Sequence, residues 1–304
     1  MKIYLNKIRE DWIIDRVKKE FSNYFKGNVT NNINKADIIW IIAPWAWEQI
    51  STNKLKRKKV ICSYYHFDFS SFDREKFNEL DKHVDEYHVI SNKTKLELGQ
   101  LTNKKINFIP FWIDEKKFFY IAEKNKLRQK FKFNYDDYLV GSFQRDTEGN
   151  DLKSPKLVKG PDIFLNIVES IYKENHSLKV VLTGKRRQFV VQGLKNLNIP
   201  YKLFEMVNFK KLNQLYNILD LYIVSSRIEG GPQAIMECGQ AKTPIISTDV
   251  GIASEILSPE SIYSPENFKI AKPNVEVAFN NSSKYLKDIG LRKFIRMFEE
   301  IYEN

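Results

Sequence analysis

The sequence of 304 residues contains only two cysteines, Cys62 and Cys238, and each lies inside an apolar segment. Two isolated cysteines do not make the disulfide framework of a small secreted domain, so we interpret them as buried free thiols in a reducing compartment. No group of Cys and His residues has the spacing of a zinc site. Disulfide-stapled and zinc-finger classes of protein are therefore excluded.

Long hydrophobic runs are also absent, and no stretch reaches the roughly 18 uncharged apolar residues of a membrane span. The longest apolar run covers residues 38–47, and Pro44 interrupts it. The first residues carry charges where a signal peptide needs an apolar stretch, so we expect no export signal and a cytoplasmic location. Hydrophobic residues make up 42% of the chain, enough for the core of one large domain or two ordinary ones.

The formal net charge is +11, and the excess is spread over both halves of the chain. One dense basic run covers residues 54–59. It is either a solvated loop before a strand or a surface that attracts anionic lipid head groups or a polyanionic acceptor. Peripheral contact with the inner face of an anionic membrane is thus one expectation. No nucleic-acid-binding motif occurs, and we expect no nucleic acid partner.

Short apolar runs alternate with amphipathic helical stretches along the whole chain. In the first half the expected helix covers residues 11–25, and the expected strands cover 2–5, 37–43, 60–65, 85–90 and 106–110. In the second half the expected strands cover 138–143, 179–183, 201–204, 221–225 and 244–248. The helices expected there cover 161–172, 209–219, 232–241 and 284–302.

This alternation predicts an α/β fold with mostly parallel sheets. The pattern restarts near residues 115–137, which indicates two doubly wound, Rossmann-like domains facing a cleft. We expect a short N-terminal domain at 1–118, a second domain at 119–280 and a C-terminal helix at 281–304 that packs back toward the first. In such sheets ligands bind beyond the carboxyl ends of the strands.

The segment 221–257 carries the most chemical information. A strand ends at Ser226, and a polar loop with Glu229, Gly230 and Gly231 leads to a helix that begins with Pro232. Glycines let backbone amides approach a ligand, and a helix N-terminus attracts phosphate or sugar oxygens. Helical spacing places Glu237 at the edge of an apolar face, half-buried and able to accept hydrogen bonds from vicinal hydroxyls.

These residues resemble the donor-site signature of the retaining, GT-B-fold glycosyltransferases of family 4, also called glycosyl transferases group 1. The matching positions are Ser226, the loop from Glu229 to Pro232, Glu237, the strand after Thr243-Pro244, and the turn from Gly251 to Glu255. The resemblance implies the transfer of a hexosyl group, with retention, from a nucleotide-diphosphate sugar to an acceptor hydroxyl of a glycan, a lipid or another molecule. It assigns donor-sugar hydroxyls to Glu229 and the nucleotide ribose to Glu237.

Upstream, residues 141–145 and 159–162 resemble the family element that neutralises the diphosphate with an Arg and a Lys. The resemblance assigns these roles to Arg145 and Lys159. Thirteen residues separate the two, more than the family spacing, so Lys153 or Lys156 is an alternative to Lys159. Cationic side chains can stabilise a leaving diphosphate without a metal, and no Asp-x-Asp motif occurs, so neither metal nor other cofactor is expected.

Further matches cover most of the chain. Leu182-Thr183-Gly184 resembles the next family strand, and residues 204–207, with Met206 and Val207, lie where the base-binding loop falls. Residues 109–114 resemble the interdomain hinge, with Phe-Trp in place of Asn-Gly. The resemblance weakens in the first half, where the usual glycine-rich loop is missing. Asn6, Lys7 or Arg9 could take its place.

His66 follows the expected strand at 60–65, where family members often place a His and a nearby Asp that face the donor sugar. The resemblance assigns His66 a catalytic role and Asp68 a supporting one. His83, His88 and His176 are expected to be structural or exposed. Trp40, Trp45 and Trp47 either belong to the core or stack on a sugar ring.

Two other functions remain open from the residues alone. His66 and Asp68 could serve as acid and base of a sugar-nucleotide epimerase or hydrolase on the same fold. The charge excess alone also allows a non-catalytic basic module that binds nucleic acid or membrane.

Overall fold

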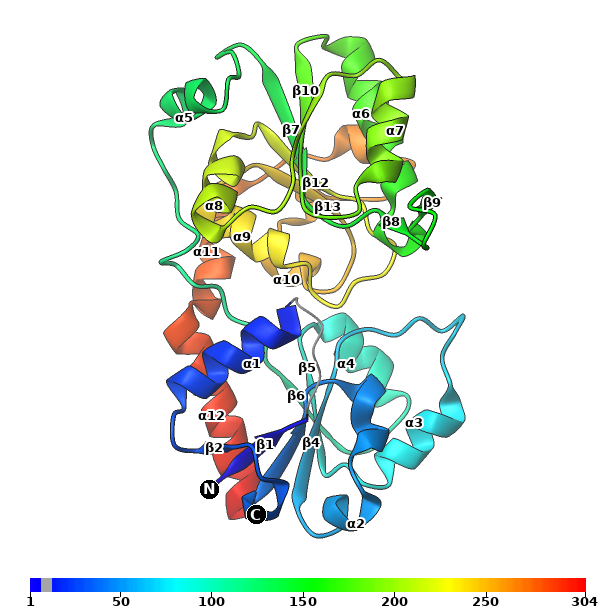
Figure 1. Ribbon diagram of the computed structural model, residues 1–304, viewed down its shortest axis with the longest axis vertical. Helices are drawn as coiled ribbons and strands as arrows, with labels where there is room; N and C mark the ends of the chain where they lie inside the picture. Colours follow the sequence, from blue (N-terminus) through cyan, green and yellow to red (C-terminus); the bar gives the residue numbers. More distant parts are fainter. Residues whose placement is uncertain (7–12) are drawn as a thin grey trace. The chain divides into compact units, whose positions relative to one another are not determined.

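The computed structural model describes residues 1–6 and 13–304, and these form two compact units (Figure 1). The first unit comprises Met1–Trp112 with Lys287–Asn304, and the second comprises Ile113–Leu286. The expected domains at 1–118, 119–280 and 281–304 remain a prediction. Lys7 and Arg9 lie outside the described residues.

The described part of the first unit contains one sheet of six parallel strands in the order β2-β1-β3-β4-β5-β6. The strands are β1 (Ile3–Leu5), β2 (Val29–Thr30), β3 (Ile38–Ile41), β4 (Lys59–Tyr64), β5 (Glu86–Val89) and β6 (Lys105–Phe108). The helices described there are α1 (Ile13–Tyr24), α2 (Thr52–Leu55), α3 (Arg74–Asp81), α4 (Asn92–Gly99) and α12 (Lys287–Glu303). Every residue of β3 is buried, as expected for a parallel strand covered on both faces.

The C-terminal helix α12 belongs to the core of the first unit. Its Phe294 and Phe298 pack against Trp40 of β3, with ring centroids 5.5 and 5.2 Å away. Figure 1 shows α12, in red, beside α1, in blue. Gly290 lets the helix approach closely, because a Cβ there would lie 2.7 Å from the Cβ of Trp112. Trp40 is therefore a core residue.

The second unit repeats the architecture with a sheet in the order β11-β10-β7-β12-β13-β14, again parallel throughout its described strands. The strands are β7 (Tyr138–Ser142), β10 (Leu178–Thr183), β11 (Tyr201–Phe204), β12 (Leu221–Val224), β13 (Ile245–Thr248) and β14 (Ile262–Tyr263). The helices are α5 (Lys124–Lys130), α6 (Pro161–Glu174), α7 (Gln188–Asn196), α8 (Phe209–Ile218), α9 (Gln233–Ala241), α10 (Ala253–Ile256) and α11 (Val275–Ser282). An antiparallel hairpin joins β8 (Thr147–Glu148) to β9 (Ser154–Pro155).

The predicted α/β class with two parallel, Rossmann-like sheets is confirmed, and each predicted strand is present within one or two residues of its expected ends. The edge strands β2 and β14 and the β8–β9 hairpin were not predicted, because two-residue strands are too short to show an alternating pattern. In the part of the chain that the structure describes, no helix has both the length and the apolar character needed to cross a membrane.

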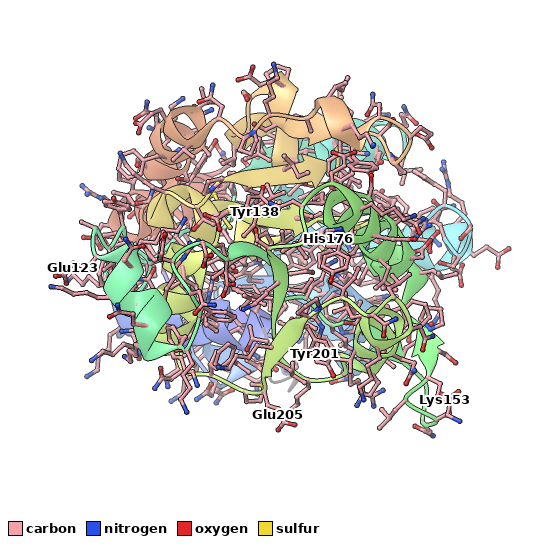
Figure 2. The ribbon with its side chains drawn as sticks, turned by 90° about the horizontal axis from the view of Figure 1, so that it is seen from above. Glu123, Tyr138, Lys153, His176, Tyr201 and Glu205 are labelled. Carbon is pink, nitrogen blue, oxygen red and sulfur yellow. The ribbon has the colours of Figure 1, made fainter. Side chains whose placement is uncertain are left out.

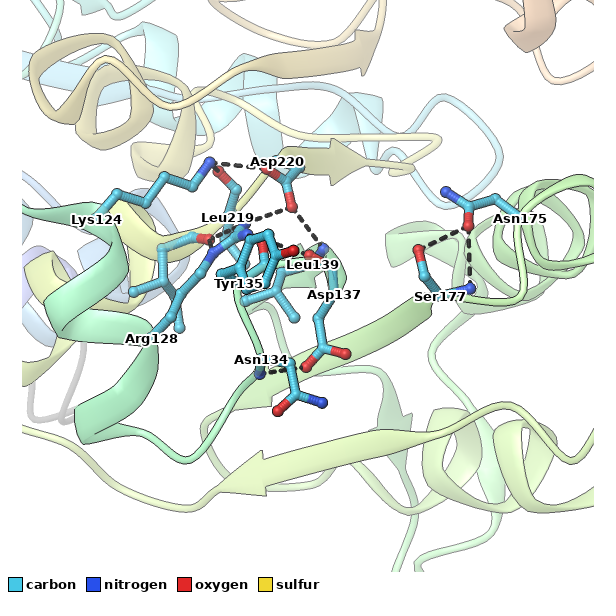
Figure 3. Close-up of polar contacts among 11 residues, drawn as sticks. Lys124, Arg128, Asn134, Tyr135, Asp137, Leu139, Asn175, Ser177, Leu219 and Asp220 are labelled. Carbon is cyan, nitrogen blue, oxygen red and sulfur yellow. Dashed lines mark hydrogen bonds and ion pairs between the residues drawn. The ribbon is translucent and has the colours of Figure 1, made fainter.

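Asp220 joins three elements at the amino-terminal edge of the second sheet (Figure 3). Its Oδ2 accepts hydrogen bonds from Leu139 N at 2.8 Å and from Arg128 Nη2 at 2.5 Å. Its Oδ1 accepts one from Lys124 Nζ at 2.8 Å. One carboxylate thus holds α5 against the starts of β7 and β12.

His88 lies fully buried in β5, in a chain of hydrogen bonds. Its Nε2 lies 2.7 Å from the carbonyl oxygen of Ile109, so this nitrogen carries the proton, and its Nδ1 accepts from Ser63 Oγ at 2.8 Å. Trp40 Nε1 in turn donates to Ser63 Oγ at 2.8 Å. The expected structural role of His88 is confirmed, and burial lowers its pKa to about 4.

This lowered pKa predicts a loss of stability in weak acid. Between about pH 6.5 and about 4 the unfolded chain binds a proton at His88 and the folded chain does not, so the free energy of unfolding falls as pH drops through that window. The change approaches about 1.4 kcal/mol per pH unit. H88Q keeps an acceptor and a donor without titrating, so its stability should fall less steeply with acid.

All five tryptophans precede residue 113, so their fluorescence during urea unfolding reports on the first unit. The exposed His176 provides the control H176Q. Parallel pH profiles for the wild type and H88Q would contradict the assignment.

Candidate active site

Four side chains meet where β7 and β12 end, at the carboxyl-terminal edge of the second sheet. Gln144 Nε2 donates to the carbonyl oxygen of Lys159 at 2.7 Å, and Ser226 Oγ donates to Gln144 Oε1 at 3.1 Å. Glu229 Oε1 lies 3.2 Å from Ser226 Oγ and forms an ion pair with Lys159 Nζ. We call Gln144, Lys159, Ser226 and Glu229 the carboxyl-edge cluster. Its ion pair is only partly exposed, at 19% for Lys159 and 15% for Glu229.

Gly160 makes this convergence possible. Its φ of +58° is left-handed, and a Cβ at this position would lie 1.8 Å from the carbonyl oxygen of Ser225. Next to it, the carbonyl oxygen of Val158 accepts hydrogen bonds from the backbone N–H groups of Arg227 and Ile228 at 2.9 and 3.2 Å. The loop that carries Lys159 is thus held directly on the loop that carries Glu229.

The thirteen residues between Arg145 and Lys159 form a hairpin loop that brings the chain back beside Asp146. They contain the β8–β9 hairpin, and Lys156 N donates to the carbonyl oxygen of Asp146 at 2.8 Å. Asp146 is itself fixed by a buried ion pair with Arg187 Nε at 2.5 Å. The unusual spacing therefore adds a hairpin without separating Arg145 from the lysines that follow it.

Lys156 shares the electrostatic environment of the cluster. Burial lowers its pKa most, the positive charges of Arg145 and Lys159 lower it further, and the nearby Glu148 and Glu229 act in the opposite direction. Lys153 instead lies exposed beside the hairpin, at the periphery of the second unit (Figure 2). Of the three lysines considered for the diphosphate, the fold gathers Lys156 and Lys159 near Arg145.

Glu237 is buried rather than half-buried. Only 6% of it is exposed, because α9 packs between α8 and α11, and its Oε2 accepts a hydrogen bond from Tyr216 Oη at 2.7 Å. Burial and the charge of Glu237 raise the pKa of Tyr216, so this phenol stays protonated and donates. Tyr216 therefore orients the carboxylate.

The loop before α9 is tightly packed. Helix α9 begins at Gln233, so Pro232 lies just before the helix rather than inside its first turn. Gly230 is buried, and Gly231 is half-buried. Gly251 packs against them with a φ of +52°, and a Cβ there would lie 2.2 Å from the carbonyl oxygen of Gly230. The backbone of this loop is thereby confined.

Gly184, Met206 and Val207 lie at the carboxyl ends of the neighbouring strands β10 and β11, at the same edge of the sheet. Gly184, with φ of +98°, donates its N–H to the carbonyl oxygen of Glu205 at 3.2 Å. Met206 is 67% exposed, and Val207 packs partly against the core. Figure 2 shows Glu205 where β11 ends.

His66 belongs to the first unit, where it follows β4. It lines a cavity of about 350 Å³ together with Asp68, Trp45 and Trp47. A hydrogen bond from the Ser70 hydroxyl, and to a smaller degree the charge of His66, lower the pKa of Asp68. Trp45 is 51% exposed, so it is a cavity residue rather than a core one. The catalytic role of His66 stays a prediction.

Asn6, considered as a substitute for the glycine-rich loop, is 1% exposed and has a structural role. Its Nδ2 donates to the carbonyl oxygen of Ala43 at 3.0 Å, and its Oδ1 accepts from Ala43 N at 3.2 Å. It joins the ends of β1 and β3. Within residues 1–6 and 13–304, no group of three or more His, Cys, Asp or Glu side chains could hold a metal ion.

Sequence reasoning missed Gln144, Tyr216 and Arg187 as parts of the site. Gln144 directly follows a predicted strand, which is a usable signal. Arg187, by contrast, has no sequence signal. Its Nη1 donates to the carbonyl oxygens of Ser142 at 2.5 Å and Thr183 at 3.0 Å, which ties the ends of β7 and β10 together.

The two units are each built on a parallel six-stranded sheet, which is the architecture of the GT-B fold. Residues 153–296 match the family model described as Glycosyl transferases group 1. The stretch 153–296 thus carries the sequence pattern of the group 1 glycosyltransferases. A search of the curated proteins finds no match to this sequence.

Solved structures share the fold along nearly the whole chain. HepE (Alr3699) of Anabaena in complex with UDP is 13% identical with a TM-score of 0.78, covering 99% of this chain and 100% of HepE. Sucrose-phosphate synthase of Thermosynechococcus elongatus is 12% identical with a TM-score of 0.72, covering 98% of this chain and 81% of the synthase. A glycosyltransferase of Rickettsia africae is 17% identical with a TM-score of 0.68, covering 98% and 84%.

Gly160 offers a direct test of how the cluster is assembled. G160A should lower the free energy of unfolding by more than about 2 kcal/mol, because the new Cβ collides with a backbone carbonyl and the backbone is left-handed. G149A is the control in the same unit. Its φ is also positive, but its new Cβ meets only the flexible side chain of Asp151, so about 1 kcal/mol is expected. Urea unfolding followed by circular dichroism measures both, and equal losses would refute the steric argument.

Proposed function

We propose that this protein transfers a sugar from a UDP-sugar donor to an acceptor hydroxyl, with retention and without a metal. The observation that carries the proposal is the carboxyl-edge cluster, in which Lys159 and Glu229 meet beside Arg145 and Lys156. The UDP-glucose complex of Anabaena HepE, at a TM-score of 0.75 and 12% identity, supports a uridine donor.

The diphosphate of the donor would bind near Arg145, Lys156 and Lys159. Lys156 is half-buried and feels the charges of both Arg145 and Lys159. Cations gathered in this way compensate the negative charge that develops on a leaving diphosphate. Glu229 forms an ion pair with Lys159. A bound diphosphate would share this lysine and leave Glu229 to accept hydrogen bonds from donor-sugar hydroxyls.

Glu237 would bind the ribose. A carboxylate offers about four acceptor positions over its two oxygens, and the hydrogen bond from Tyr216 orients it toward hydroxyl donors. Gly184, Met206 and Val207 would border the base, since they follow β10 and β11 at the same sheet edge. Ser226, Gly230, Gly231 and Pro232 would shape the loop around the phosphates and sugar.

The cavity around His66 supports a carbohydrate or lipid-linked acceptor, because aromatic side chains such as Trp45 and Trp47 stack on sugar rings. His66 would contact the reacting groups there. The buried free thiols Cys62 and Cys238 agree with a cytoplasmic location. In the basic run 54–59, Lys54 and Lys58 bond to the loop at Asn34 and Ala36, which favours a structural role over contact with a membrane.

Substitution of the two glutamates should separate their roles. E229Q should lower kcat/KM at least 100-fold, equal to about 2.7 kcal/mol, while UDP binding changes little. E237Q should weaken UDP binding at least tenfold. Calorimetry with UDP and a transfer assay with UDP-glucose measure both effects. The exposed Glu266 provides the control E266Q, and normal turnover and UDP binding in both variants would refute the site.

Substitution of His66 tests the catalytic assignment in the first unit. H66A should lower kcat at least tenfold and leave the Kd of UDP unchanged, because the nucleotide contacts are proposed for the second unit. H176A, also an exposed histidine, is the control. Product analysis decides the reaction: free glucose or an epimer in place of a transferred sugar would replace transfer with hydrolysis or epimerisation.

A further inference from the structure

A second cavity, of about 530 Å³, lies away from the carboxyl-edge cluster in the second unit. It is open to solvent and is bordered by the end of α5 with the residues that follow it, the strand β11 and the first turns of α8. Figure 2 shows α5 near Glu123 and β11 between Tyr201 and Glu205. The lining residues are five lysines, two phenylalanines and two neutral amides: Lys130, Lys132, Lys202, Lys210, Lys211, Phe131, Phe204, Asn208 and Gln214. We call this cavity the lysine pocket, and no acidic side chain lines it.

The positive charges of the lysine pocket are not compensated by carboxylates. Among the described residues none of the five lysines forms an ion pair. Lys130 Nζ donates to Gln214 Oε1 at 3.0 Å and Lys202 Nζ to the carbonyl oxygen of Phe131 at 2.7 Å, so their partners are neutral. In the same helix α5, Lys124 and Arg128 do pair with Asp220 (Figure 3). Within α5, the cations Lys124 and Arg128 are therefore neutralised by a carboxylate, whereas Lys130 at the pocket is not.

Aromatic rings line the pocket beneath its two half-buried lysines. Lys202 Nζ lies 5.3 Å from the ring centroid of Phe133 and 5.6 Å from that of Phe204, and Lys211 Nζ lies 4.8 Å from Phe204. Cation–π attraction favours these positions and keeps the ammonium groups together despite their mutual repulsion. The pocket thus holds concentrated positive charge in a defined place.

The walls of the pocket are fixed by hydrogen bonds. Arg128 Nη1 donates to the carbonyl oxygens of Tyr135 and Asp137 at 2.8 and 3.2 Å, which holds the chain after α5. Asn208 caps α8 by accepting from Lys211 N at 2.9 Å. The positive end of the ten-residue helix α8 therefore adds to the charge of the lysines. Such a preformed concave surface of one sign attracts anions strongly.

We propose that the lysine pocket is a second ligand site, which binds a phosphate-bearing anion. The lysine pocket shares no lining residue with the carboxyl-edge cluster, and of the segment 204–207 it includes only Phe204, so it can be tested separately from the proposed transfer reaction. Ammonium groups pair with phosphate as compact point charges, and a cavity of this volume encloses a multiply charged group rather than an extended chain. The phosphate belongs either to a free small molecule or to a lipid head group.

The test uses the full chain with two probes. Inorganic tripolyphosphate is titrated by calorimetry, and vesicles of phosphatidylcholine with phosphatidylglycerol are used in co-sedimentation. The pocket variant K202Q/K211Q removes the two half-buried charges and should weaken binding at least tenfold. The control K195Q/K272Q removes two exposed lysines of the same unit and should change binding less than twofold.

The variant R145Q/K159M separates the lysine pocket from the carboxyl-edge cluster. Tripolyphosphate binding that survives in R145Q/K159M and is lost in K202Q/K211Q supports a site for a free phosphorylated molecule. Vesicle binding lost only in K202Q/K211Q supports a lipid head group. The proposal fails if neither probe binds, if both lysine pairs have equal effects, or if only R145Q/K159M loses binding. None of these results depends on UDP binding or transfer.

Discussion

The contact between Gly160 and the carbonyl oxygen of Ser225 is the constraint on which the candidate site depends. Only a residue without a Cβ fits there, and the backbone is left-handed as well. Lys159 precedes this glycine and Glu229 follows the strand that ends near Ser225, so the close approach brings a cation and a carboxylate together. The helix α6 then begins directly at Pro161. One glycine therefore couples the helix start, the ion pair and two sheet strands.

A buried ion pair also stabilises the hairpin loop between Arg145 and Lys159. Asp146 and Arg187 are 1% and 2% exposed, and such a pair is stable only when further hydrogen bonds satisfy it. Arg187 Nη1 donates to the ends of β7 and β10, while its buried Nη2 has no hydrogen-bond partner among the described residues. The long spacing in the sequence is thus a hairpin added at the periphery, and the cationic residues at its two ends remain neighbours.

The second unit distributes its charge in three distinct ways. At the amino-terminal edge of the sheet, Asp220 neutralises Lys124 and Arg128, which gives α5 a fixed position. At the carboxyl-terminal edge, one carboxylate partly compensates several cations. In the lysine pocket no carboxylate is present among the lining residues. The two incompletely neutralised regions are the ones to which we assign ligands.

The sequence by itself determined the class of fold and the two parallel sheets, and it predicted the segment 221–257 as the chemical centre. These features follow from local patterns: apolar runs bury strands on both faces, and glycine and proline mark where strands end and helices begin. Glu229, Ser226 and Lys159 could be selected because their neighbours in the chain identify them. Tertiary structure alone decided that Glu237 is buried against Tyr216, that Lys156 joins Arg145, and that five lysines from three separate elements share a pocket. The physical reason is that burial and electrostatic neighbours depend on which elements pack together, and such contacts between distant segments leave no periodic signal in the chain.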